Sequence, residues 1–169
     1  MTAAPAEPHF SSLAFEDVPR PDHADVVVVP LPDGATTDPA AWARAIFDVR
    51  STPLWVRAAF ALRQALVPLI GVGRGDQGVF DVARVEGEEA LIVADDTHLD
   101  FRCAVGVDGA ARLVRVTTVV RLHGWRGRAY FAPVRLAHGP VLTAMLHRAA
   151  RRLGQSSDPA RRRPRRARG

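Results

Sequence analysis

Four polar residues stand close together in this sequence and are of types that can do chemistry. They are Asp95, Asp96, His98 and Asp100. Carboxylates and imidazoles that converge from one side can hold a metal ion or transfer protons. On an extended chain, however, His98 and Asp100 point to one side, whereas Asp95 and Asp96 point to opposite sides and belong to a hairpin end. We therefore interpret the group as a solvated strand face and expect no metal site.

Cys103 could act as a nucleophile if a base lay within reach and its pKa were lowered. It alternates with Phe101 and Val105, which places it on the apolar face of a strand. A free cysteine in that position behaves as a small buried hydrophobic residue. Because it is also the only cysteine, an intrachain disulfide is excluded.

Tyr130 and His138 are the best candidates for polar groups in an apolar pocket. A single tyrosine or histidine on an inner face often fixes the orientation of a bound molecule. The alternative is that Tyr130 packs with its hydroxyl in water, while His138 caps a helix. Both interpretations stay open at this point.

Two further segments have a composition that suggests phosphate or nucleic-acid binding, but each lacks a feature that such binding requires. The loop Gly71–Gly78 lacks the strand-then-helix context of a dinucleotide fingerprint, and the chain contains no lysine for a phosphate-binding loop. The arginine-rich segment Arg161–Arg168 has no interleaved aromatic residue for base stacking. We expect only nonspecific, salt-sensitive attraction to polyanions from it.

Composition favours one globular domain. The chain has 169 residues, of which 47% are hydrophobic, and a formal net charge of +5, and one domain is the usual content of this length. All of the net positive charge lies in residues 154–169, so residues 1–153 are neutral overall. We expect disordered ends at residues 1–8 and 154–169 around a single domain of residues 9–153. The sequence shows no signal peptide and no membrane span, so we expect a cytoplasmic protein.

Periodicity predicts the helices and strands that carry these residues. A β-branched run at 25–30 predicts the first strand. Asp38 with Pro39 predicts a capped helix through Phe47, and Pro53 begins a second amphipathic helix carrying Trp55. From Val79 the period changes to two, which predicts strands at 79–86, 89–95, 97–107 and 111–125. A last strand is expected at 128–136, followed by a helix that begins at Gly139-Pro140 and ends at Gly154.

The alternation assigns faces to the two longest strands. Leu99, Phe101, Cys103 and Val105 share one face, as do the even-numbered residues from Val114 to Leu122. The opposite faces are polar, and there we expect Asp100 and Arg102 to pair with Arg115 or Arg121. One apolar and one polar face is typical of an antiparallel sheet covered on one side. The element order predicts an α+β helix-grip fold, in which a curved antiparallel sheet wraps around a long C-terminal helix.

The chain also resembles a known bacterial family, Domain of Unknown Function 2867. The similar segments are the strand start Phe80-Asp81-Val82, the strand end Arg121-Leu122-His123, the stretch from Gly127 to Val134, and the closing helix from His138 to Arg148. That family is similar to the START-like and polyketide-cyclase-like helix-grip superfamily. The resemblance implies a helix-grip fold and a pocket for an apolar ligand, and it carries over no catalytic residue.

We therefore expect a protein that binds a small, largely apolar molecule between the sheet and the C-terminal helix, without a cofactor or metal. The expected ligand-binding residues are Leu99, Phe101, Val116, Thr118, Tyr130, Leu142 and Met145. One alternative is a cyclase- or dehydratase-like enzyme using Tyr130, His123 or Asp81 as general acid or base. Another is a noncatalytic interaction module with a filled core. The sequence leaves the ligand and the oligomeric state open.

Overall fold

The computed structural model describes residues 11–48 and 80–155 of the chain. The described elements are, in order, η1 (Leu13–Phe15), β1 (His23–Pro30), α1 (Pro39–Phe47), β2 (Val82–Glu86), β3 (Glu89–Asp96), β4 (Leu99–Asp108), β5 (Leu113–Leu122) and α3 (Gly124–Gln155). The expected helix that begins at Pro53 lies outside the described residues, as do the loop at 71–78 and the arginine-rich segment 161–168.

The five strands form one antiparallel sheet in the order β1-β5-β4-β3-β2. The long hairpin of β4 and β5 turns after Asp108, whose side chain accepts a 2.6 Å hydrogen bond from the amide of Ala111. Its register places Cys103 opposite Thr118 and Val105 opposite Val116, so the predicted apolar face is confirmed. β1 then pairs with β5 and brings an early segment of the chain to the edge of the sheet.

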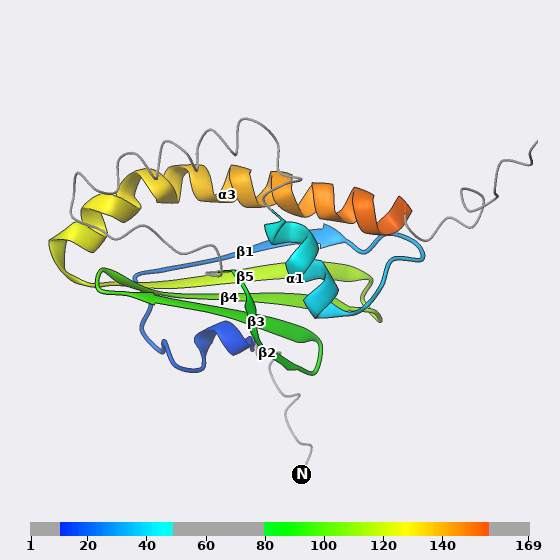
Figure 1. Ribbon diagram of the computed structural model, residues 1–169, viewed down its shortest axis with the longest axis horizontal. Helices are drawn as coiled ribbons and strands as arrows, with labels where there is room; N and C mark the ends of the chain where they lie inside the picture. Colours follow the sequence, from blue (N-terminus) through cyan, green and yellow to red (C-terminus); the bar gives the residue numbers. More distant parts are fainter. Residues whose placement is uncertain (1–10, 49–79, 156–169) are drawn as a thin grey trace, which may run out of the picture.

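Helix α3 runs along one face of the sheet, which we call the inner face, and α1 lies beside its C-terminal half (Figure 1). The predicted capping of α1 is confirmed, because the Asp38 side chain accepts a hydrogen bond from the amide of Ala40 at 2.9 Å. This α+β arrangement of an antiparallel sheet and a long C-terminal helix is consistent with the helix-grip fold.

The expected strand at 128–136 is wrong, because these residues belong to α3, which begins at Gly124 rather than at Gly139. Tyr130 and Phe131 are buried and Val134 is half-buried, which is a spacing of three to four and not of two. That spacing lets one side of a helix pack on the sheet. Pro133 and Pro140 each remove one backbone hydrogen-bond donor inside the helix, yet α3 is continuous from Gly124 to Gln155.

Two apolar clusters pack between α3 and the inner face. The larger one lies under the C-terminal half of α3, where Leu142, Met145 and Leu146 meet Trp42 of α1 and the middle of the sheet. The smaller one lies under the N-terminal half, where Tyr130 and Phe131 pack on Val120. The core of the described structure therefore has two apolar parts along one helix.

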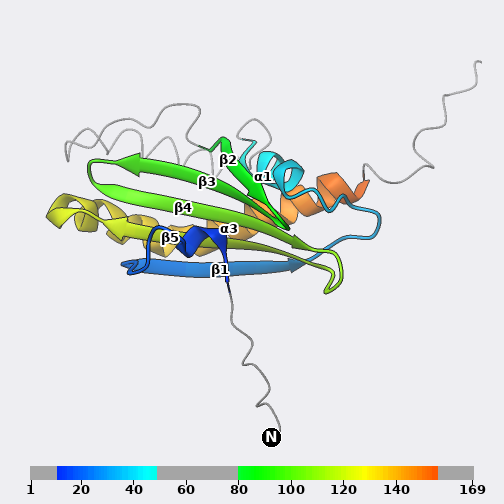
Figure 2. The same ribbon diagram turned by 90° about the horizontal axis from the view of Figure 1, so that it is seen from below.

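The opposite face of the sheet, the outer face, is not simply solvated as expected. The segment 11–22 with η1 lies across it (Figure 2), and Ala14 and Val18 pack there on Leu91, Ala104 and Val119. The sequence suggests one covered face because Arg102 and Thr117 look like surface residues, yet both are buried. Among the described helices, none is long and apolar enough to cross a membrane.

Candidate ligand-binding site beneath helix α3

A compact group of polar side chains lies between the inner face and α3. His23 and Asp25 alternate along β1 and therefore point to the same side. Thr118 stands directly opposite Asp25 on β5. From α3, His138 reaches down so that its Nε2 lies 3.2 Å from the Thr118 hydroxyl and 3.3 Å from Asp25 Oδ2. We call these four residues the inner polar cluster.

The inner polar cluster is mostly removed from water. Side-chain exposure is 17% for His23, 25% for Asp25 and 19% for His138, and Thr118 is 1% exposed. The His23 ring lies 5.1 Å from the Phe131 ring and 6.1 Å from the His138 ring, centroid to centroid. Phe131 belongs to the smaller apolar cluster, whereas Leu142, one turn beyond His138, belongs to the larger one. The polar residues thus lie between two apolar regions under the same helix.

Two buried polar atoms of this cluster have no hydrogen-bond partner among the described residues. They are His23 Nε2 and Asp25 Oδ1. His23 Nε2 lies 3.4 Å from Asp25 Oδ2, which is within ion-pair distance, but the Oδ1 atom meets no donor. Most buried polar atoms in proteins form a hydrogen bond, so two neighbouring buried atoms without one require an explanation.

The cluster keeps Asp25 ionised. Burial alone raises the pKa of this carboxyl, but the hydrogen bond from His138 and the positive charges of His138 and His23 outweigh burial, and the pKa lies below its usual value of 3.8. At neutral pH, Asp25 is therefore an acceptor only.

The lowered pKa of Asp25 predicts a pH dependence of stability. A carboxyl with a depressed pKa in the folded state contributes stability above its unfolded pKa, and that contribution is lost as the pH falls below about 4. We expect urea unfolding between pH 5 and pH 3 to show a smaller loss of stability for Asp25→Asn than for the unchanged protein. Parallel pH profiles for the two proteins would contradict the assignment.

Cys103 lies next to the cluster, in an environment that disfavours the thiolate form needed of a nucleophile. It is 1% exposed, and burial, together with the negative charge of Asp25, raises the pKa of its thiol to about 12 although Thr118 hydrogen-bonds to it. The interpretation as a small buried hydrophobic residue is thereby supported. We expect iodoacetamide at pH 8 to label native protein only at the rate of unfolding, and fast stoichiometric labelling would refute this.

The structure distributes the expected ligand-binding residues over both apolar clusters and the polar one. Val116, Leu142 and Met145 are buried in the larger cluster, with Phe101 packed against it. Tyr130 is buried in the smaller cluster, with Leu99 packed against it. Thr118 belongs to the inner polar cluster. Both Tyr130 and His138 lie on α3, facing the sheet, so the capping alternative for His138 is wrong because it lies inside the helix.

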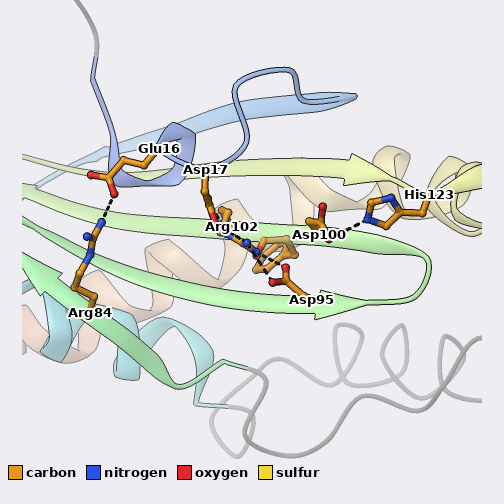
Figure 3. Close-up of polar contacts among 8 residues, drawn as sticks. Glu16, Asp17, Arg84, Asp95, Asp100, Arg102 and His123 are labelled. Carbon is orange, nitrogen blue, oxygen red and sulfur yellow. Dashed lines mark hydrogen bonds and ion pairs between the residues drawn. The ribbon is translucent and has the colours of Figure 1, made fainter.

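The other polar residues of interest lie elsewhere. His123 binds Asp100, with 2.9 Å between Nε2 and Oδ1, and Asp81 is exposed. Figure 3 shows the polar contacts of the outer face, where Arg102 binds Asp95 and also Asp17 of the N-terminal segment. The register places Arg121 directly opposite Asp100, as expected, but the Asp100 carboxylate binds His123. Arg102 binds Asp17 and Asp95 instead of the expected partners Arg115 or Arg121.

No group of three or more potential ligands that could hold a metal ion occurs within residues 11–48 and 80–155. The group Asp95, Asp96, His98 and Asp100 does not converge, because Asp95 and Asp100 are instead bound to Arg102 and His123.

His23 and Asp25 are the site residues that sequence reasoning missed. They precede the apolar run Val26–Val29, and the strand predicted at 25–30 includes Asp25 but begins after His23, whereas β1 begins at His23. The signal was their alternation in phase with Val27 and Val29, whose side chains enter the larger apolar cluster. A polar residue at an inward position of a strand indicates either a buried partner or a site.

Comparison with the curated proteins and with the solved structures finds no match to this chain. The family described as Protein of unknown function (DUF2867) matches over residues 18–145, a range that contains β1, the whole sheet and the part of α3 that carries His138. The resemblance that the sequence suggested is thereby confirmed, and the chain belongs to the DUF2867 family.

Proposed function

We propose that this protein binds a small, largely apolar molecule between the sheet and α3, and that the inner polar cluster supplies its polar contacts. The observation that carries the proposal is that two buried atoms, Asp25 Oδ1 and His23 Nε2, make no hydrogen bond among the described residues, although His23 Nε2 lies 3.4 Å from Asp25 Oδ2. They lie between two apolar clusters, which is the chemistry typical of small-molecule sites. A bound molecule would satisfy the polar atoms and extend along the apolar side chains.

The seven expected contact residues lie at different distances from the inner polar cluster. Thr118 belongs to the polar cluster itself, and Tyr130 packs beside Phe131, whose ring contacts His23. Phe101 packs against both apolar clusters. Leu142 and Met145 line the C-terminal end of the proposed site, and only a long ligand would reach them from the inner polar cluster.

The test is native mass spectrometry of freshly purified protein, compared with its denatured mass. We expect a mass excess that disappears on denaturation, and we expect Asp25→Asn to reduce its occupancy at least about tenfold, since hydrogen bonds to charged groups are worth about 1.5–3 kcal/mol. Asp33→Asn is the matched control, because the Asp33 side chain is 99% exposed.

The size of the site is tested by Met145→Trp, which adds volume at the C-terminal end. If the ligand occupies this end, binding should fall while the fold is retained. If Met145 only fills a packed core, the same change should lower stability by about 1–3 kcal/mol through overpacking. No retained mass and no bound apolar probe would favour an interaction module with a filled core.

A second candidate function is acid–base catalysis on the bound molecule. It is favoured by one observation, the 3.3 Å contact between His138 Nε2 and Oδ2 of the ionised Asp25, since a histidine oriented by a carboxylate is the usual general base. The isolated ligand, incubated with the protein in deuterium oxide, should then exchange a carbon-bound proton, and His138→Gln should abolish that exchange.

A further inference from the structure

The donor and acceptor inventory of the inner polar cluster restricts the chemistry of its ligand. Asp25 Oδ2 is shared by two imidazole nitrogens, His138 Nε2 at 3.3 Å and His23 Nε2 at 3.4 Å. Asp25 Oδ1 has no donor, although it is buried. The missing group must therefore donate a hydrogen bond to a carboxylate.

His23 restricts the ligand in a second way. Its Nε2 is buried and makes no hydrogen bond among the described residues, and it lies beside the same carboxylate that the ligand must meet. A ligand group that gives its one proton to Asp25 can meet Nε2 only as an acceptor, with the imidazole proton on Nε2. The ligand group should then accept a hydrogen bond from His23 while it donates one to Asp25.

We propose that the inner polar cluster selects a neutral hydroxyl group, the alcohol or phenol of an otherwise apolar molecule. A hydroxyl is the smallest group that donates and accepts at once. It would donate to Asp25 Oδ1 and accept from His23 Nε2, so that both unpartnered atoms are satisfied by one oxygen. This inference rests on the proposed function and names the ligand class for the same site.

Charged ligand groups fit the cluster less well. A carboxylate has no proton for Asp25 at neutral pH and would place two negative charges together, which is unfavourable away from water. An ammonium group could donate to Asp25, but it would face His23 and His138, which both lie near this carboxylate, and it would lose its strong hydration.

The surroundings argue that the rest of the ligand is apolar and flat or narrow. The Phe131 ring lies 5.1 Å from the His23 ring at a tilt of 56°. Phe131 and Tyr130 belong to the smaller apolar cluster, against which Leu99, Phe101 and Leu122 also pack. An aromatic or aliphatic body next to these rings would gain the burial of apolar surface.

The experiment compares four probes with one ring system: 2-naphthol, naphthalene, 2-naphthoate and 2-naphthylmethylammonium. Isothermal titration calorimetry would give each affinity for the full chain at pH 7.5. We expect 2-naphthol to bind about 10- to 100-fold more tightly than naphthalene, because one of its hydrogen bonds is to a charged acceptor. 2-Naphthoate and 2-naphthylmethylammonium should each bind more weakly than 2-naphthol.

Two variants connect this preference to the cluster. Asp25→Asn and His23→Phe should each reduce the preference for 2-naphthol over naphthalene at least about tenfold while the affinity for naphthalene stays the same. Asp33→Asn should leave both affinities unchanged. The comparison uses the ratio of the affinities for 2-naphthol and naphthalene on the same protein. A variant that folds poorly would lower both affinities and can be recognised in this way.

The outcomes separate the inference from the function on which it rests. Equal binding of 2-naphthol and naphthalene would overturn the hydroxyl preference and leave apolar binding intact. Tightest binding by 2-naphthylmethylammonium, lost in Asp25→Asn, would show a cation site and also overturn it. No binding of any probe, naphthalene included, would overturn both the inference and the proposed function.

Discussion

Replacing Gly127 by alanine should lower the free energy of unfolding by about 3 kcal/mol, the upper end of the range for overpacking. Gly127 is buried at the start of α3, and a Cβ atom there would lie 2.3 Å from the backbone carbonyl oxygen of His98. That carbonyl cannot turn away freely, because it accepts a 2.8 Å hydrogen bond from the amide of His123. The change would force the helix off the turn between β3 and β4.

The control for this prediction is Gly139→Ala in the same helix. A Cβ at Gly139 meets nothing within 4 Å, so alanine gains helix propensity there. Pro140 follows directly and disfavours a side chain on the preceding helical residue. The net change should therefore stay within about 0.5 kcal/mol in urea unfolding. Similar effects of the two substitutions would show that the start of α3 is not fixed against His98.

If α3 is fixed in this way, the proposed ligand site depends on it. His138 contributes to the inner polar cluster from α3, whereas His23, Asp25 and Thr118 contribute from the sheet. A shift of the helix start would separate these two sets of groups. Gly127→Ala should consequently weaken ligand binding as well as stability, without changing any residue of the site.

The sheet could be predicted from sequence because its information is local. Alternation along residues 99–105 and 114–122 predicted the inner face, and the Asp108-Gly109 pair between them is typical of a hairpin turn. The capped helix α1 was likewise predicted by adjacent residues, Asp38 and Pro39. Each of these features depends on neighbours in the chain and on a period of two or 3.6.

The errors concern residues whose environment is set by distant parts of the chain. The segment 128–136 contains Tyr130, Phe131 and Val134, which favour strands intrinsically, but its burial pattern is helical because α3 packs on the sheet. The outer face was expected to be solvated because Arg102 is charged. Its partner Asp17 is 85 residues away in sequence, so no local pattern indicates the pair.

The candidate site residues were chosen from the same kind of local information. Thr118, Tyr130 and His138 were proposed because they interrupt or border apolar patterns. His23 and Asp25 come from an edge strand that is paired with β5 almost a hundred residues later. Only that pairing brings Asp25 opposite Thr118, and only the position of α3 adds His138.

Replacing Glu89 by alanine should destabilise the protein by about 3 kcal/mol or more, since it breaks a buried charged network. Glu89 is 6% exposed. Its Oε2 accepts hydrogen bonds from the Ser12 hydroxyl at 3.1 Å and the Leu13 amide at 2.7 Å. Its Oε1 accepts from two nitrogens of Arg115, at 3.2 and 3.0 Å. One carboxylate therefore joins the N-terminal segment to the sheet.

The same substitution should release the N-terminal segment before the sheet unfolds. Hydrogen–deuterium exchange of residues 11–22 should become faster in Glu89→Ala than exchange of β4 and β5, because the segment loses two of its anchoring bonds. The outer-face contacts of Arg102 with Asp17 and of Arg84 with Glu16 (Figure 3) would remain. These involve exposed carboxylates and contribute less.

Glu86→Ala is the matched control for Glu89→Ala. Glu86 lies directly opposite Glu89 in the hairpin of β2 and β3, but its side chain is 63% exposed and makes only a 3.6 Å ion pair with Arg84. Its removal should change stability by less than about 0.5 kcal/mol. If both substitutions had this small effect, the N-terminal segment would be held by its other contacts, such as the packing of Ala14 and Val18 and the ion pairs of Glu16 and Asp17, and the buried carboxylate would not be its anchor.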